Sequence, residues 1–253
     1  MPNNTTTRLT VTGPEKEIQK FIGLCCYHVN EKNYQGEEIK DSDGKPVPML
    51  VFDFDKIIPC PKELERTISP TRTEADYNKA LKNGTQSKEL QELRDAIEAS
   101  KLCQKKYGYS NWYDFKCYNW GTKWGAYDCH EIERSDGKFV LGYSTAWSPA
   151  QPIIIKLGEM FPKLHFINRY MDEGWGYYGS HEVCGEEEID CDNSNGCHTD
   201  DFIEFANQYL DVYLIRCSNC NEICHEDYVD KNNRCERCQE QAEEKEGKEE
   251  KVT

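Results

Sequence analysis

Four cysteines near the C-terminus have the spacing of a metal site. They form two Cys-x-x-Cys pairs, Cys217 with Cys220 and Cys235 with Cys238, and fourteen residues separate the pairs. Each pair can place two thiolates on one ion, and two pairs complete the tetrahedral shell of a structural Zn²⁺ site. The residues between the pairs are mostly polar, so metal binding would supply most of the folding free energy there. We therefore predict a structural zinc ribbon over 212–240, whose closed shell leaves no position for a substrate.

The same cysteines could instead form disulfides, because fourteen cysteines in one chain are typical of secreted, cross-linked proteins. However, the chain does not open with a basic segment followed by an apolar one, and no apolar run approaches the ~20 residues that span a bilayer. A chain of 253 residues can also bury a core without cross-links. We therefore favour zinc over disulfides, and we predict a protein of the reducing cytoplasm without membrane association.

A second set of metal-ligating residues lies further upstream, in an acidic stretch. It comprises Cys184, Cys191, Cys197 and His198. Six and five residues separate the three cysteines, which is irregular, and neighbouring carboxylates compete as ligands. The sequence leaves a second zinc site open here, and it also leaves open that Cys224 or His225 replaces one ligand of the first site.

The formal net charge of −15 is concentrated in the last third of the chain. From residue 182 onward the sequence holds 21 of the 46 acidic residues but only 7 of the 31 basic ones, so residues 1–181 are nearly neutral. Such a surface repels phosphate backbones and favours basic partners, including the nucleic-acid grooves of other proteins. We predict an acidic partner-binding surface, with solubility as the alternative explanation; its residues are Glu186, Glu187, Glu188, Asp190 and Asp192.

An aromatic-rich segment, 112–128, is a second candidate for recognition, with Trp120 and Trp124 as its site residues. Aromatic rings can stack on nucleobases, but only Lys116 and Lys123 supply positive charge within the segment. Tryptophan is also ordinary core material when its polar atom has a partner. We therefore favour packing for this segment and keep a recognition surface as the alternative.

The remaining pattern indicates which elements position these residues. Strands are predicted where apolar and polar residues alternate, and helices where apolar residues recur on one face. The predicted strands are 8–13, 49–54, 138–145, 165–170, 176–183 and 212–215. The predicted helices are 15–27, 74–106 with a break at Asn83 and Gly84, a helix that begins at Ser148, and 199–210. The order fits an α+β fold, a ferredoxin-like antiparallel sheet with helices on one face.

We divide the chain into four parts on this basis. Residues 1–183 form the ferredoxin-like body, with a helical insertion over about 73–130. Residues 184–211 form an acidic loop, over 184–198, and a helix. The zinc ribbon follows over 212–240, and residues 241–253 are charged, poor in apolar residues and predicted to be disordered.

Four short motifs resemble those of the YubB-like ferredoxin-fold proteins of bacteriophages and conjugative plasmids. They are Met1-Pro2-Asn3, Leu9-Thr10-Val11-Thr12-Gly13-Pro14, Asn119-Trp120-Gly121-Thr122-Lys123-Trp124 and Thr145-Ala146-Trp147-Ser148-Pro149. The resemblance covers about residues 1–183. The chain departs from the family at Asn4-Thr5-Thr6, where members usually carry a Trp-Cys pair, and the zinc pairs are not a constant family feature. Residence on mobile elements implies a role against host functions.

No catalytic motif is present, and we name no catalytic residue. We expect a non-enzymatic modulator that is encoded by a phage or plasmid and acts in the host bacterial cytoplasm. It would inhibit a host defence protein with a basic nucleic-acid groove, such as a CRISPR effector nuclease, through its acidic surface. A nucleic-acid-binding accessory protein that uses the aromatic-rich segment 112–128 and the zinc ribbon is the first alternative. A metal-dependent enzyme is the second.

Overall fold

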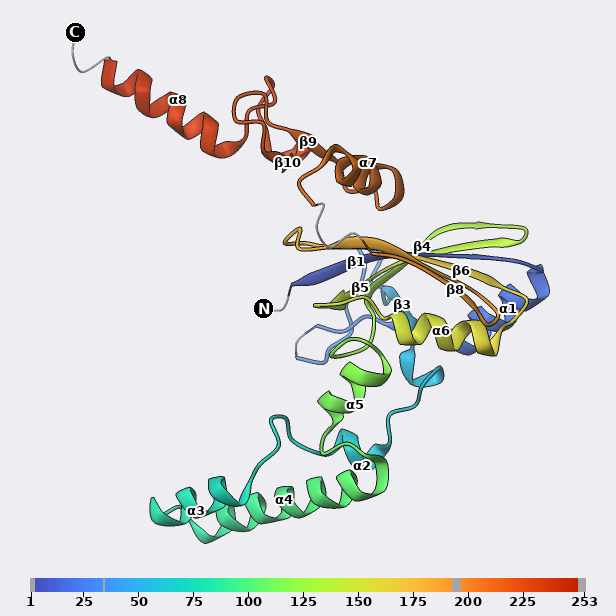
Figure 1. Cartoon of the computed structure of the whole chain (residues 1–253), viewed down its shortest axis with the longest axis vertical. Coiled ribbons are helices and arrows are strands. Elements are labelled where there is room, and N and C mark those ends of the chain that lie inside the picture. The colour runs from blue at the N-terminus through green and yellow to red at the C-terminus, as the bar shows by residue number, and fades with distance from the viewer. Residues whose placement is uncertain (1–2, 34, 193–196, 250–253) are drawn as a thin grey trace.

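The centre of the molecule is a six-stranded antiparallel sheet with the strand order β4-β5-β1-β6-β7-β8 (Figure 1). The computed structural model describes residues 3–33, 35–192 and 197–249, and for 189–192 and 243–249 it describes the backbone only. The strands of the sheet are β1 (Asn4–Thr12), β4 (Tyr127–Ser135), β5 (Lys138–Ala146), β6 (His165–Asp172), β7 (Tyr178–Cys184) and β8 (Glu187–Asp192).

Two helices, α1 (Glu15–Cys25) and α6 (Gln151–Met160), cover one face of this sheet. Along the chain the order β1-α1-β4-β5-α6-β6, with the strands arranged β4-β5-β1-β6, is the ferredoxin-like topology. In β1 every second side chain is buried, so Leu9 and Val11 point into the core that α1 and α6 close. The prediction of a ferredoxin-like antiparallel sheet with packed helices is confirmed.

A hairpin and a helical arm are inserted between α1 and β4. The hairpin consists of β2 (Cys26–Asn30) and β3 (Pro48–Phe52) and is followed by the 3₁₀-helix η1 (Phe54–Lys56). The arm consists of α2 (Lys62–Glu65), α3 (Glu74–Lys82), α4 (Ser87–Tyr107) and α5 (Trp112–Asn119), and α3 and α4 extend away from the sheet (Figure 1). The predicted break falls between α3 and α4, where Gly84 has a φ of 72°.

The opposite face of the sheet is covered at one end by the C-terminal part of the chain (Figure 1). This part contains α7 (Asp200–Tyr209), the short hairpin β9 (Leu214–Arg216) and β10 (Ile223–His225), the 3₁₀-helix η2 (Glu226–Tyr228) and α8 (Glu236–Glu249). Met171 and Tyr178 of the sheet form a second hydrophobic core with Phe202 of α7 and with Ile223. An ion pair between Arg8 of β1 and Asp211 also joins the two parts.

Two predictions about the C-terminal third are wrong. Within the predicted acidic loop 184–198, Glu187–Asp192 form β8, because backbone pairing with β7 satisfies their peptide groups although few side chains are apolar. The predicted disordered tail is helical as far as Glu249, because Glu, Gln, Lys and Ala favour helices without a buried face. Residues 250–253 lie outside the described part of the chain.

Among the described residues, none of the helices combines the length and the apolar character that crossing a lipid bilayer requires.

Candidate metal centre and adjoining pocket

The four predicted cysteine ligands come together in the structure. The Sγ atoms of Cys217, Cys220, Cys235 and Cys238 all lie within 4.8 Å of one another. Cys220 Sγ and Cys235 Sγ are 3.8 Å apart, and an ideal tetrahedron with metal–sulfur bonds of about 2.3 Å has edges of about 3.8 Å. None of the described cysteines forms a disulfide. The arrangement therefore fits a four-coordinate metal ion and not a cross-link.

Two different local structures present these sulfurs. Cys217 and Cys220 lie in the turn between β9 and β10, where Asn221 adopts a φ of 61° and donates its N–H to Cys217 O. Cys235 directly precedes α8, and Cys238 lies in the first turn of that helix. The N-terminus of a helix stabilises negative charge, so this position favours a thiolate at Cys238. At Cys235, the backbone N–H donor of Cys238 lowers the pKa of the thiol, but burial and hydrogen bonds with the neighbouring cysteine side chains outweigh it and raise that pKa to about 12. Within each of these two turns, the hydrogen bonds and the two-residue spacing hold the two cysteine side chains of a pair close together.

Backbone and side-chain donors surround the sulfur of Cys217. The N–H of Cys235 donates to it at 3.3 Å and the N–H of Asn219 at 3.4 Å. Hydrogen bonds from the backbone N–H groups of Cys235 and then Cys220 lower the pKa of the Cys217 thiol from 9.0 to about 6. The side-chain amide of Asn219 also donates to Cys238 Sγ at 3.3 Å. The sulfurs thus have the donors that thiolate ligands need outside their metal shell.

The alternative ligands do not join this group. Cys224 Sγ lies 3.7 Å from the carbonyl of Ile215, and His225 Nδ1 lies 3.3 Å from Asp227 Oδ2. Within the described side chains, the only metal-like cluster of three or more Cys, His, Asp or Glu is the four-cysteine group.

The second zinc site that the sequence left open does not bring Cys184 and Cys197 together. Cys184 ends β7, whereas Cys197 packs in the second core with Tyr178, the first residue of β7. The ends of a strand of this length lie about 20 Å apart, so one ion cannot bind both sulfurs. His198 is exposed, and the side chain of Cys191 lies outside the described residues.

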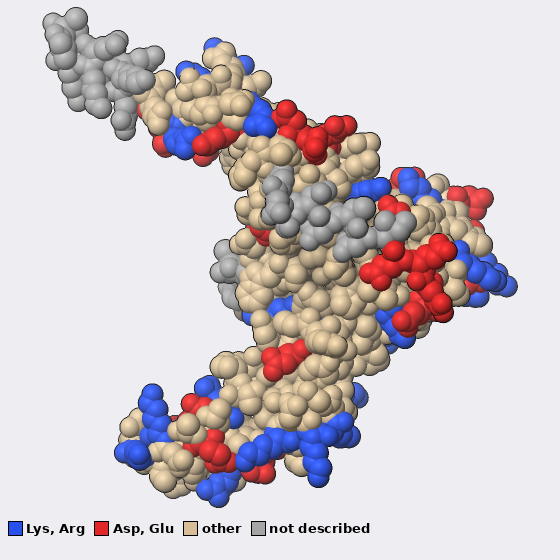
Figure 2. Space-filling model, viewed as in Figure 1, with Lys and Arg blue, Asp and Glu red and all other residues tan. Residues whose placement is uncertain are grey.

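The predicted acidic surface lies at the outer edge of the sheet. Glu186, Glu187 and Glu188 are exposed in and after the turn that leads into β8, the outermost strand. Figure 2 shows acidic side chains gathered at this end of the sheet, while Lys and Arg concentrate on the helical arm. Glu188 Oε1 also lies 2.8 Å from Nε2 of the buried His181. The side chains of Asp190 and Asp192 lie outside the described residues.

Trp120, predicted as a partner-binding residue, is a core residue. Its side chain is 2% exposed, its indole N–H donates to Ile58 O at 2.8 Å, and its ring packs edge-on against Phe54. Burial leaves no ring face for a nucleobase. Trp124 is only half-buried, and Lys123 Nζ lies 4.4 Å from its ring centre and 4.9 Å from that of Trp147.

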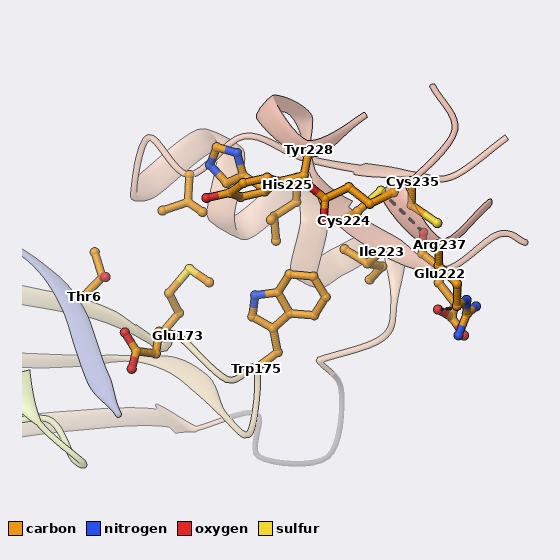
Figure 3. Close-up of a pocket in the computed structure, with 14 residues that line it drawn as sticks. Thr6, Glu173, Trp175, Glu222, Ile223, Cys224, His225, Tyr228, Cys235 and Arg237 are labelled. Carbon is orange, nitrogen blue, oxygen red and sulfur yellow. Dashed lines mark hydrogen bonds and ion pairs between the residues drawn. The ribbon is translucent and has the colours of Figure 1, made fainter. Parts of the chain in front are cut away.

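A pocket of about 540 Å³ lies between the sheet and the metal centre (Figure 3). Its lower wall comes from the end of the sheet, with Thr6, Glu173 and Trp175, and its upper wall includes His225, Tyr228 and the metal ligand Cys235. In Figure 3 the indole of Trp175 points from the lower wall toward Tyr228 and His225. No sequence motif predicts this pocket, although the aromatic Trp175 between Gly174 and Gly176, in the turn between two predicted strands, is a signal for it.

The match to a family model supports the ferredoxin-like fold. A family described as the ferredoxin-like domain in Api92-like protein matches residues 123–213, which include β4 to β8 and α7. Among solved structures, the chain is similar to the protein api92 from Yersinia pseudotuberculosis, with 12% sequence identity and a TM-score of 0.40. The aligned region covers 78% of this chain and 99% of that chain. No curated protein matches the sequence.

Proposed function

We propose that this chain is a non-enzymatic modulator that binds a basic surface of a partner protein through the acidic edge of its sheet. The observation that carries the proposal is the exposure of three consecutive glutamates, Glu186, Glu187 and Glu188, beside the outermost strand. Of these three side chains, only Glu188 forms an ion pair within the described part of the chain, with His181. The edge therefore presents concentrated negative charge to solvent.

The position on an edge strand also makes this surface accessible to a partner. Side chains alternate between the two faces of a strand, so neighbouring glutamates extend to both sides of the edge. Glu188 lies opposite Val183 of β7, whose side chain is on the face of the sheet that packs in the main core. Glu187 lies opposite Cys184, whose side chain is on the other face of the sheet. A cationic groove could thus enclose the edge from both sides. Electrostatic complementarity of this kind raises the association rate and is weakened by salt.

The partner class follows from the charge. A basic groove that normally holds a nucleic-acid backbone is a strongly cationic surface, and an anionic edge can compete with the nucleic acid for it. We propose that the partner is a host protein with such a groove, such as a nucleic-acid-guided defence nuclease, and that the gene resides on a phage or plasmid. This origin rests on the sequence resemblance described above.

We assign Zn²⁺ to the four-cysteine cluster, with a structural role. Four thiolate donors in a tetrahedron suit Zn²⁺, which has no geometric preference from its d electrons. A shell of four protein ligands leaves no position for a substrate or a reactive water, so the site does not favour a metal-dependent enzyme. The role of the ion is to hold β9, β10 and the start of α8 together beside the sheet.

The test is a capture experiment with variants of the edge. The unaltered protein and the variant Glu186→Lys, Glu187→Lys, Glu188→Lys are used to capture partners from host lysate, and recovery is quantified by mass spectrometry. A matched control reverses three exposed glutamates of α4, Glu89→Lys, Glu92→Lys and Glu98→Lys, and changes the net charge by the same amount.

We expect the edge variant to lose the partner, the α4 variant to keep it, and added single-stranded nucleic acid to displace it. Equal recovery by the unaltered protein and the edge variant would refute the electrostatic proposal. Direct, salt-sensitive binding of nucleic acid by the purified chain would instead favour an accessory protein that binds nucleic acid, with Trp124 rather than Trp120 as its exposed ring.

A further inference from the structure

The pocket between the sheet and the metal centre has walls from two parts of the chain that are distant in sequence. Glu173 and Trp175 belong to the turn between β6 and β7, and His225, Tyr228 and Glu236 belong to the segment around the metal centre. Its volume of about 540 Å³ lies within the range of about 300–1,000 Å³ that is typical of ligand sites. The pocket is therefore large enough for a long side chain of another protein.

The turn holds Trp175 in a fixed position before any ligand arrives. Its backbone has a φ of 58°, a left-handed conformation that is unfavourable for a bulky residue. Asp172 stabilises the turn, since its carbonyl accepts from the N–H of Trp175 at 3.0 Å and its carboxylate accepts from the N–H of Gly176 at 3.1 Å. The indole packs edge-on against Phe202, with ring centres 6.2 Å apart. Strain of this kind is typical of functional positions.

The charges around the indole are mainly negative. The carboxylate of Glu173 accepts a hydrogen bond from the side-chain amide of Asn4 at 2.8 Å, which orients it but leaves its charge. On the opposite wall Glu222 is paired with Arg237 at 2.8 Å, whereas Glu236 adds another negative charge at the start of α8. An aromatic ring and an oriented carboxylate that line the same pocket are groups that bind an organic cation.

We propose that this pocket receives the guanidinium group of an arginine side chain from the basic partner. The planar guanidinium can stack on the indole of Trp175 and donate two hydrogen bonds to the carboxylate of Glu173, which a compact ammonium group does less well. The inference rests on the proposed function, because it names the side chain by which a basic partner is recognised. The pocket and the acidic edge lie at opposite ends of β7, so the arginine anchor is separate from the diffuse charge of Glu186, Glu187 and Glu188.

The test uses a small probe that does not depend on the identity of the partner. Nα-acetyl-arginine amide is titrated into the zinc-loaded protein, and the indole N–H resonances are followed by NMR, with that of Trp175 assigned by its loss in Trp175→Leu. The matched neutral probe is Nα-acetyl-citrulline amide, which has nearly the same shape but no charge. We expect the arginine probe to bind with a dissociation constant on the order of 1 mM and to shift the Trp175 resonance.

Citrulline should bind at least about tenfold more weakly, and Trp175→Leu should weaken arginine binding by about tenfold. Glu173→Gln should weaken it by about threefold. Tyr118→Leu removes an aromatic ring that is 74% exposed on α5 and should leave binding unchanged. Equal shifts with both probes, or no shift of the Trp175 resonance, would overturn the inference.

The edge variant separates this inference from the proposed function. Glu186→Lys, Glu187→Lys, Glu188→Lys should bind the arginine probe as the unaltered protein does, because these residues do not line the pocket. If the unaltered protein captures a partner but does not bind the probe, the inference fails and the proposed function stands. If the probe binds while the edge variant captures the partner as well as the unaltered protein does, the proposed function fails instead.

Discussion

Removal of one metal ligand should unfold the C-terminal segment and leave the sheet intact. The perturbation is Cys238→Ser, which replaces a buried thiolate ligand with a hydroxyl that binds Zn²⁺ poorly. Chelation of the metal from the unaltered protein should have the same effect. We expect residues 212–240 to lose their hydrogen bonds, because on the proposed zinc assignment the metal supplies most of the free energy that orders them.

The structure sets the size of this effect. Apart from metal ligands, only Leu214 and Ile223 are buried apolar side chains within 212–240. Burial of two such side chains contributes about 3–6 kcal/mol, whereas a structural zinc ion contributes about 10–16 kcal/mol at neutral pH. The apolar contacts of the segment are therefore too few to replace the metal. In contrast, the main core contains Leu9, Val11 and many more side chains from β1, β5, β6, α1 and α6.

Hydrogen exchange monitored by mass spectrometry measures the effect segment by segment. Amides of β9 and β10 should exchange rapidly in Cys238→Ser, while those of β1 and β5 stay protected. The control is Cys224→Ser, which changes a half-buried cysteine of the same segment that is not among the clustered ligands. It should retain one zinc ion per chain and normal protection. Unchanged protection of β9 and β10 in protein shown to be metal-free would refute the reasoning.

Three further predictions concern the body of the molecule. Trp120→Ala removes a buried ring and an indole hydrogen bond and should lower the free energy of unfolding by about 3–5 kcal/mol. Trp124→Ala should change it by less than about 1.5 kcal/mol. Urea denaturation measures both free energies, and similar losses in the two variants would contradict the burial argument. The pKa of Glu63 is lowered to about 2, chiefly by a hydrogen bond from the Lys106 side chain and less by its own backbone N–H and by Tyr107. This pair joins α2 to α4. Its stabilising effect is complete above the ordinary carboxyl pKa of 4.5 and is lost as the pH falls toward 2. A ¹³C titration of the carboxyl group should show this midpoint and its return toward 4.5 in Lys106→Met; an unshifted midpoint in that variant would exclude Lys106 as the cause. Gly121→Ala should destabilise by about 1–3 kcal/mol, because Gly121 has a φ of 76° and a Cβ would lie 2.7 Å from the proline in the first turn of α6; an unchanged melting temperature would show that the contact relaxes.

The aromatic motifs show how far local patterns predict a site. The Asn119–Trp124 segment is rich in aromatic residues, the segment around Trp147 is one of the motifs that carry the family resemblance, and the structure brings the two together. Ser148 Oγ donates to Gly121 O, and Thr122 Oγ1 donates to Ala146 O. Most of these residues are therefore packing contacts between the arm and the sheet. Composition alone does not distinguish a buried ring from an exposed one, because both environments favour aromatic side chains.

The amino-acid sequence by itself determined the elements whose cause is local. The ligand pairs Cys217 with Cys220 and Cys235 with Cys238 are specified by spacing within one turn, and the core strands by the alternation of residues such as Leu9 and Val11. The concentration of acidic residues after position 181 is likewise a property of composition.

Only the tertiary structure decided which of these elements meet. β8 exists because β7 offers it a pairing edge, and the Trp175 pocket exists because a turn of the sheet lies beside a segment about fifty residues further along the chain. Cys184 and Cys197 are close in sequence, yet β7 separates them. The physical reason is that the spacing of residues along the chain specifies contacts within one turn. Contacts between distant segments depend instead on how whole surfaces pack together, and a local sequence pattern holds no information about that packing.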